Sequence, residues 1–224
     1  MYRSKPLTQP LTLGLTALLL SGTAGAADNF AGNAYYYGDP HAHTGLSHDG
    51  RSSDLGDGCP SEGECGAFAD VFTIATDNAL DWVVLSDHVN GLHATTPDEF
   101  AMLLDASLNA PRSSDLLVIP GVEDWFAAGG VGMGHKNLLL FGDPAGLIDL
   151  ELGDVQPNGD STIEIGTCPA IATWMYGLTA EFGDALLIPH HPMVENPMPT
   201  DWSCHSGAYE PAVEMFSSWG TGLG

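Results

Sequence analysis

The sequence predicts a parallel α/β fold of the barrel type, because three patterns coincide in it. Apolar runs of strand length alternate with segments whose apolar residues recur at helical spacing. Polar side chains that can bind metal ions recur where the predicted strands end. In parallel α/β barrels the carboxyl ends of the strands form one face, which carries the active site. About five or six strands are predicted, too few for a closed barrel, so we expect an incomplete one.

Strand and helix signals alternate in the first half of the chain. An aromatic run ending in Gly-Asp predicts a strand over 35–39, and apolar residues at helical spacing predict a helix over 67–78. The continuous apolar run 82–85 suits a strand buried on both faces. The stretch Thr96-Pro97-Asp98-Glu99 predicts a helix start with a capping box. A further apolar run predicts a strand over 116–119.

The second half continues the alternation after a glycine-rich stretch. Residues 129–134 predict a flexible loop, and not a dinucleotide-binding turn, because a strand follows them where that motif needs a helix. The remaining predicted elements are the strand 135–141, the long acidic loop 142–166, the helix 171–182, and the strands 185–189 and 212–216.

The N-terminus has the pattern of a signal peptide. Arg3 and Lys5 precede a short apolar run over 11–20, and Ala24-Gly25-Ala26 fits the small-residue cleavage pattern. We therefore expect a signal peptide over 1–26, and a mature domain over 27–224 that is secreted or periplasmic. The alternative is a retained membrane anchor, for which the apolar run is short.

The composition is strongly acidic. The 224 residues include 29 Asp and Glu but only 5 Lys and Arg, a formal charge of −24. Such a surface repels nucleic acid phosphates and anionic membranes. We expect a small-molecule ligand, no nucleic acid partner and no stable membrane association after cleavage; the sequence leaves the oligomeric state open.

Four cysteines in an exported chain suggest disulfide bonds. Cys59 and Cys65 enclose a tight loop and are the likeliest pair, which would leave Cys168 to pair with Cys204. Three connectivities are possible from sequence alone. A structural zinc ion bound by all four thiolates is the rival interpretation.

Imidazoles and carboxylates gather at or beside the predicted strand ends. His41 and His43 are two residues apart, so in an extended chain their side chains point the same way. Single histidines are often structural, but the joint pattern indicates a site for zinc, manganese or iron. The candidate metal ligands are His41, His43, Asp49, His88, Glu123, His135 and His190.

Neighbouring polar residues are expected to have other roles. Asp87 points away from the target of His88 and is expected to orient a ligand imidazole. His48 competes with Asp49 for one ligand position, and Asp49 is preferred. His93 and His205 are expected at the surface, and His191 is expected to face away from the site.

Four ordered motifs resemble those of the PHP (polymerase and histidinol phosphatase) family. The stretch 38–49, with its His-x-His, resembles the first motif, and Leu85-Ser86-Asp87-His88 resembles the second. Gly121-Val122-Glu123 with His135 is similar to the third motif, and Ile188-Pro189-His190 to the fourth. The resemblance implies a distorted (βα)7 TIM-like barrel of the PHP type that holds up to three ions of zinc, manganese or iron.

The resemblance also implies a division of the ligands among the ions. It assigns His41 and His43 to one ion, Glu123 as the bridge to a second ion held by His135 and His190, and Asp49 with His88 to a third. The family normally completes this site with an Asp-x-His motif, and none follows Phe216. We therefore expect the C-terminal strands of the barrel to be missing from this chain.

The implied activity is a metal-dependent phosphoesterase that hydrolyses a phosphate ester with a metal-activated water. Glu123 would be catalytic, and Arg51, close to Asp49, would contact the phosphate or else be a surface charge. One rival is an amidohydrolase-type enzyme with a carbamylated lysine bridge, but Lys136 should face away from the site. The other rival is a non-catalytic secreted module that binds metal.

Overall fold

The computed structural model describes residues 29–30, 33–47, 67–89, 95–110, 116–128, 131–156, 163–164, 168–190, 200–217 and 220–221. Several predictions fall on other parts of the chain. Outside the described residues lie the predicted signal peptide 1–26, His48, Asp49, Arg51, the pair Cys59 and Cys65, His93 and His191.

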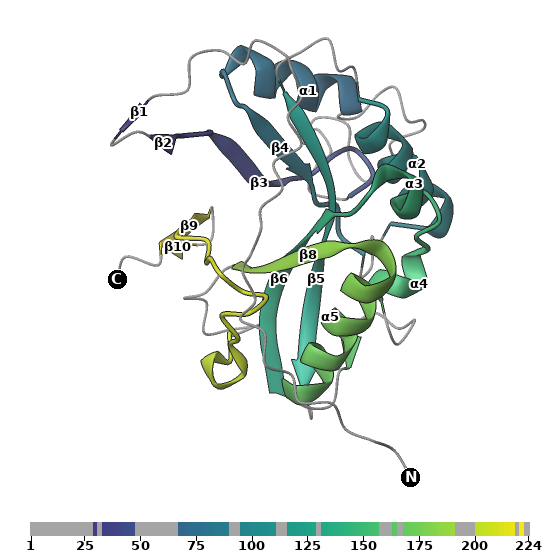
Figure 1. Cartoon of the computed structure of the whole chain (residues 1–224), viewed down its shortest axis with the longest axis vertical. Helices are drawn as coiled ribbons and strands as arrows, with labels where there is room; N and C mark the ends of the chain where they lie inside the picture. The colour runs from purple at the N-terminus through teal and green to yellow at the C-terminus, as the bar shows by residue number, and fades with distance from the viewer. Residues whose placement is uncertain are drawn as a thin grey trace.

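The core of the fold is a mixed β-sheet (Figure 1). Its strand order is β3 (Gly38–Ala42), β4 (Trp82–Leu85), β5 (Leu117–Ala128), β6 (Val131–Phe141) and β8 (Asp184–His190), with β7 (Ile163–Glu164) also paired to β5. The pairs β3–β4 and β4–β5 are parallel, whereas β5–β6 and β6–β8 are antiparallel.

The predicted (βα)7 TIM-like barrel is therefore wrong. Parallel neighbours need a crossover connection, usually a helix. The strand that follows β5 is instead β6, which runs antiparallel to it, so that Gly121 pairs with Leu139 and Ala128 with Val131. The glycines at 132 and 134 belong to β6, not to the predicted loop. The result is a half-barrel sheet, parallel on one side and antiparallel on the other.

The strands and helices otherwise follow the sequence pattern closely. The helices are α1 (Phe68–Asp77), α2 (Pro97–Leu108), α3 (Pro144–Leu147), α4 (Leu152–Val155), α5 (Cys168–Phe182) and the 3-10 turn η2 (Trp202–Cys204). The capping box of α2 is confirmed: Glu99 N donates to Thr96 Oγ1 at 3.3 Å, and Thr96 N donates to Glu99 Oε2 at 2.7 Å. The predicted acidic loop 142–166 is wrong in part, because α3, α4 and β7 form within it.

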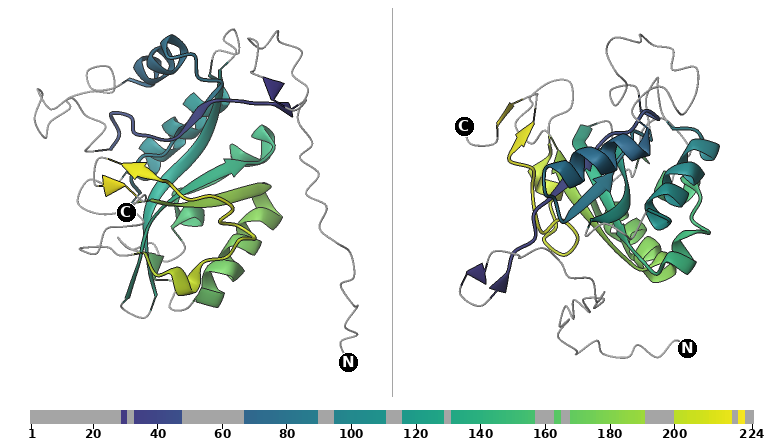
Figure 2. Two further views of the ribbon diagram at one scale, coloured as in Figure 1. Left: turned by 90° about the vertical axis from the view of Figure 1, so that its left-hand side faces the viewer. Right: turned by 90° about the horizontal axis from the view of Figure 1, so that it is seen from above.

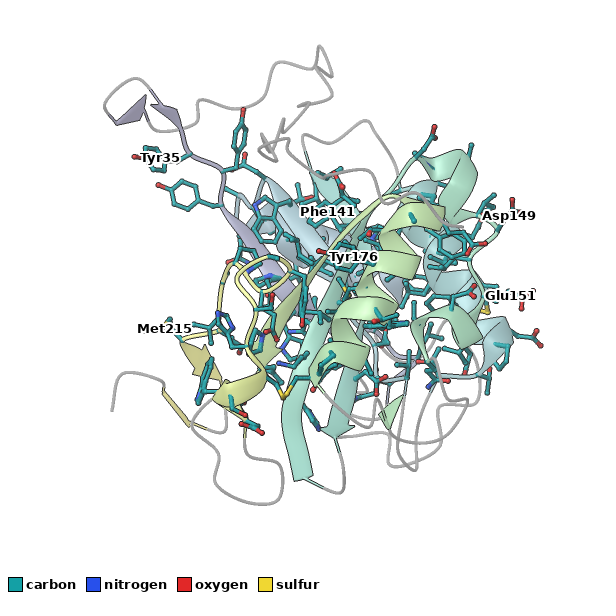
Figure 3. All side chains as sticks on the ribbon, turned by 60° about the horizontal axis from the view of Figure 1, so that its bottom comes forward. Tyr35, Phe141, Asp149, Glu151, Tyr176 and Met215 are labelled. Atoms are coloured by element: carbon teal, nitrogen blue, oxygen red, sulfur yellow. A yellow bond between two sulfur atoms is a disulfide. The ribbon has the colours of Figure 1, made fainter. Side chains whose placement is uncertain are left out.

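The helices cover the outer face of the sheet (Figure 1). On this face Leu138 and Leu187 pack with Ile171 and Met175 of α5 in one apolar cluster. A second cluster joins buried residues of β4 and β5 to α1 and α2. Figure 3 shows Tyr176, Asp149 and Glu151 on the outside of this helical layer, where all three are exposed. The inner face of the sheet carries a smaller apolar cluster of Val84, Ile119 and Leu139, together with polar side chains.

The segment 200–217 runs alongside β8, as Figure 2 shows in yellow. Leu187 N donates to Tyr209 O at 2.7 Å, and Glu214 N donates to Pro189 O at 3.1 Å. The strand predicted over 212–216 is wrong, because 211–215 is irregular and only β9 (Phe216–Ser217) pairs with β10 (Gly220–Thr221).

Two short strands, β1 (Asn29–Phe30) and β2 (Asn33–Ala34), precede the sheet, and β3 begins three residues later than the strand predicted over 35–39. No helix in the described ranges is both long and apolar enough to cross a membrane.

The predicted pairing of Cys168 with Cys204 is confirmed. This disulfide joins the start of α5 to η2, and so attaches the segment 200–217 to the helical layer.

We predict that replacing both Cys168 and Cys204 by serine lowers the free energy of unfolding by about 3–4 kcal/mol, because the bond closes a loop of sequence separation 36. Urea denaturation measures this change. Ser203→Ala in the same turn is the control and should leave the unfolding midpoint in place. Equal stability of the double variant and the parent chain would contradict the prediction.

Candidate metal centre

His41 of β3 and His43, just after this strand, meet a buried carboxylate on the inner face of the sheet. The Nε2 atoms of His41 and His43 lie 2.8 Å apart. They lie 2.9 Å and 3.0 Å from Oε2 of Glu123. We call these three atoms the first donor set. The register of β3 shifts between Asp39 and Ala42, so His41 lies within an irregularity of the strand and His43 directly after it.

Glu123 lies among the histidines of the cluster because β5 continues past the end of β4. Glu123 N donates to Asp87 O at 3.1 Å, and residue 123 forms an isolated parallel bridge with His88. This bridge brings His88 Nε2 to 3.5 Å from Oε2 of Glu123. Glu123 is only 1% exposed, so its carboxylate meets the protein interior and not bulk water.

The other carboxylate oxygen of Glu123 meets histidines from the antiparallel half of the sheet. His135 of β6 and His190 of β8 are directly paired in register. His135 Nδ1 lies 2.5 Å, and His190 Nε2 3.7 Å, from Oε1 of Glu123. These atoms form the second donor set. The two oxygens of one carboxylate thus face two different groups of imidazoles.

The structure brings together six of the seven predicted ligands; Asp49 is outside the described residues. The six are His41, His43, His88, Glu123, His135 and His190. Three groups have ligand atoms within 4.8 Å of one another and can hold a metal ion: His41, His43 and Glu123; Glu123, His135 and His190; and His41, His190 and Glu214.

The donor atoms fit a transition metal ion. The edges of the first donor set are 2.8, 2.9 and 3.0 Å. A tetrahedral ion with bonds of about 2.0–2.1 Å separates its ligand atoms by about 3.3 Å, only slightly more than these edges. Imidazole nitrogen and carboxylate oxygen suit zinc, manganese and iron. The His and Glu cluster can therefore hold a transition metal ion.

Glu214 is a member of the cluster that the sequence did not reveal. Its Oε2 lies 3.3 Å from Nδ1 of His41 and also contacts Nδ1 of His190. Both rings therefore turn Nδ1 toward Glu214 and Nε2 toward Glu123. This is the arrangement of a carboxylate that orients metal-binding imidazoles from behind. One acidic residue among 29, in an irregular segment, gives no sequence signal for this role.

Asp87 organises the loop after β3. Its buried carboxylate accepts hydrogen bonds from Thr44 N (2.8 Å), Thr44 Oγ1 (2.8 Å), Ser47 N (3.0 Å) and Ser47 Oγ (2.7 Å). Because the Ser47 hydroxyl donates to Asp87, it accepts from Nδ1 of His43 at 3.2 Å. His43 then keeps the lone pair on Nε2, the atom in the first donor set. Asp87 thus orients an imidazole, as predicted, but acts through Ser47.

The charges in the cluster are strongly coupled. Burial by itself would raise the pKa of Glu123, but hydrogen bonds with His135, His41 and His43 hold it well below its usual range. Burial opposes a charge on His41, but the carboxylates of Glu123 and Glu214 raise its pKa to about 9. Burial, together with the charge on His41, lowers the pKa of His190. For Glu214 the two histidines overcome burial and lower the pKa to about 2.

Two further predictions concern residues near the cluster. Lys136 is buried on the opposite face of β6 and forms an ion pair with Glu210, so it does not bridge the donor sets. His205 is 42% exposed at its side chain, as expected of a surface residue, and lies 3.3 Å from Glu210 Oε2.

Comparison of the sequence with protein-family models and with curated proteins gives no match.

We predict different losses for the two carboxylates of the cluster. Glu123→Gln replaces one of the two carboxylate oxygens by an amide NH2 and removes the negative charge, so only one donor set keeps an oxygen and the number of bound ions should fall. Glu214→Gln leaves the first and second donor sets in place but weakens the orientation of His41 and His190, and should lower affinity by about 10- to 100-fold at unchanged stoichiometry. Metal titration followed by mass spectrometry of bound metal separates these outcomes. Glu181→Gln, on the exposed end of α5, is the control. Full binding by Glu123→Gln would contradict the assignment.

We also predict that metal binding strengthens with pH. The pKa of His41 is about 9 in the metal-free chain, against 6.5 for a free imidazole, so the ring is protonated near neutrality. An ion must displace this proton, and its apparent affinity should rise about tenfold per pH unit until the pH nears the pKa of His41. Competition with a chelating dye between about pH 6.5 and 8.5 measures the slope. A flat profile would contradict a protonated His41.

Proposed function

We propose that this chain is a metal-dependent phosphoesterase of the PHP type, which hydrolyses a phosphate ester at a centre of two or three divalent ions. The observation that supports it best is the division of one buried carboxylate between two donor sets. Oε2 of Glu123 meets His41 and His43, and Oε1 meets His135 and His190. A shared carboxylate is the arrangement that keeps two ions close together.

The first donor set would hold one ion and the second donor set another, with Glu123 common to both. His88, at 3.5 Å from Glu123, would serve a third ion together with Asp49. When bound, such ions lower the pKa of a coordinated water and balance the negative charge that develops on phosphoryl oxygens. The chain itself fixes the imidazoles, through Glu214 behind His41 and His190 and through Ser47 behind His43.

The charge of the protein favours a small anionic ester over a polymer. A net charge of −24 repels nucleic acid and anionic membranes. Within the described ranges Lys136 is the only lysine or arginine, and it is buried against Glu210. We therefore assign the positive charge at the site to the ions and imidazoles, with Arg51 as the proposed additional phosphate contact. A secreted or periplasmic location would bring such a site into contact with extracytoplasmic substrates.

We predict that the mature chain loaded with zinc, manganese or iron hydrolyses p-nitrophenyl phosphate. Glu123→Gln should lower kcat/KM by at least about 10³-fold, because a neutral amide with one oxygen can no longer bridge the two ions. Release of nitrophenol is measured alongside bound metal. The control Glu181→Gln should keep the parent rate.

The same assay tests the rival functions. Hydrolysis of amides but not of phosphomonoesters or phosphodiesters would favour an amidohydrolase-type enzyme, in spite of the pairing of Lys136 with Glu210. Two bound ions without turnover of any ester or amide would overturn the enzymatic proposal and favour a metal-binding module.

A further inference from the structure

Asn137 is a buried amide beside the bridging carboxylate. It lies in β6 directly opposite Glu123 of β5 and Ile188 of β8. Residues directly opposite one another in an antiparallel pair point to the same face of the sheet. The side chain of Asn137 therefore lies on the inner face with Glu123, between Leu139 and His135 in the alternation of β6.

The amide of Asn137 has no hydrogen-bond partner in the described part of the chain. The residue is 0% exposed, and neither Nδ2 nor Oδ1 meets a donor or acceptor. Its neighbour Lys136, on the opposite face of the same strand, is paired with Glu210. Buried polar side chains are normally satisfied, and one that is not destabilises the fold more than an apolar residue of the same shape. Asn137 is therefore expected to serve a group that binds at this place.

The neighbouring carboxylate of Glu123 indicates what kind of group Asn137 binds. Directly opposite residues have Cβ atoms about 4.5–5.5 Å apart. Asn137 and Glu123 are thus neighbours that form no direct hydrogen bond. A carboxylate has about four lone-pair positions, and two of them are needed to face the two donor sets. A water molecule between the amide and the carboxylate would find the two or more polar partners that an internal water requires.

We propose that Asn137 is a positioning residue that holds an internal water against the carboxylate of Glu123, and so fixes the orientation of that carboxylate between the two donor sets. The inference rests on the metal centre of the proposed function. It concerns metal affinity and not turnover, so it can be tested before any substrate is known. It also gives Asn137 a reason to be polar in a layer that otherwise contains Leu139 and Ile188.

Asn137→Leu tests the proposal, because leucine has nearly the shape of asparagine but no polar atoms. Stability of the metal-free mature chain should change little, since the amide and the water that it holds are removed together and replaced by an apolar group of the same shape. Affinity for zinc, measured by competition with a chelating dye, should fall by about 10- to 100-fold, as for other residues that orient metal ligands. A residue with a merely structural role would show the opposite combination, lower stability with unchanged affinity.

Two variants complete the experiment. Ser107→Ala removes a buried hydroxyl that donates to Leu103 O in α2, far from the centre, and should leave zinc affinity unchanged. Asn137→Ser keeps a hydroxyl and leaves space for water, so it should recover most of the affinity lost in Asn137→Leu, and it also serves if the leucine variant fails to fold. Parent-like zinc affinity in Asn137→Leu, or leucine-like affinity in Asn137→Ser, would overturn the role of Asn137 while leaving the centre itself intact.

Direct observation of the water gives a second readout. A crystal structure of the zinc-loaded chain should contain a water within hydrogen-bond distance of both Asn137 and Glu123. A direct bond from Asn137 to another protein group would overturn the proposal. If the parent chain binds no zinc, manganese or iron at all, the proposed function fails together with this inference, an outcome distinct from the loss of the Asn137 role alone.

Discussion

The contact between the carboxylate of Glu123 and five imidazoles is the interaction on which the candidate centre depends. The Nε2 atoms of His41 and His43 lie 2.8 Å apart, within hydrogen-bond distance of each other, and both lie within 3.0 Å of Oε2 of Glu123. Glu123 is 1% exposed, so little water screens its charge. Burial of an isolated carboxylate would be unfavourable, and the surrounding imidazoles make its ionised form the stable one.

The mixed sheet explains how this contact is assembled. The parallel half places His41 of β3, His43 just after β3, and His88 after β4 beside the middle of β5. The antiparallel half places His135 directly opposite His190. Because β5 belongs to both halves, a residue in its middle can reach ligands from either side. Glu123 occupies that position, and neither half of the sheet would supply both donor sets alone.

A second layer of side chains fixes the orientation of the imidazoles. Asp87 secures Ser47, Ser47 accepts from His43, and Glu214 contacts Nδ1 of His41 and of His190. Glu214 reaches the cluster because the segment 200–217 is attached to β8 by backbone hydrogen bonds and to α5 by the Cys168–Cys204 disulfide. The layer that covers the outer face of the sheet thus also stabilises groups on its inner face.

Sequence by itself determined the parts of this protein that depend on neighbours along the chain. The capping box at Thr96, the apolar run of β4 and the ligand types at 41, 43, 88, 123, 135 and 190 are local patterns, and the structure contains them. Only the tertiary structure decided the direction of β6. An apolar strand after glycines can follow a short turn, which makes it antiparallel to β5, or a crossover connection, which makes it parallel. It also decided the place of Glu214, since an acidic residue acquires a partner only when a distant segment of the chain folds beside it.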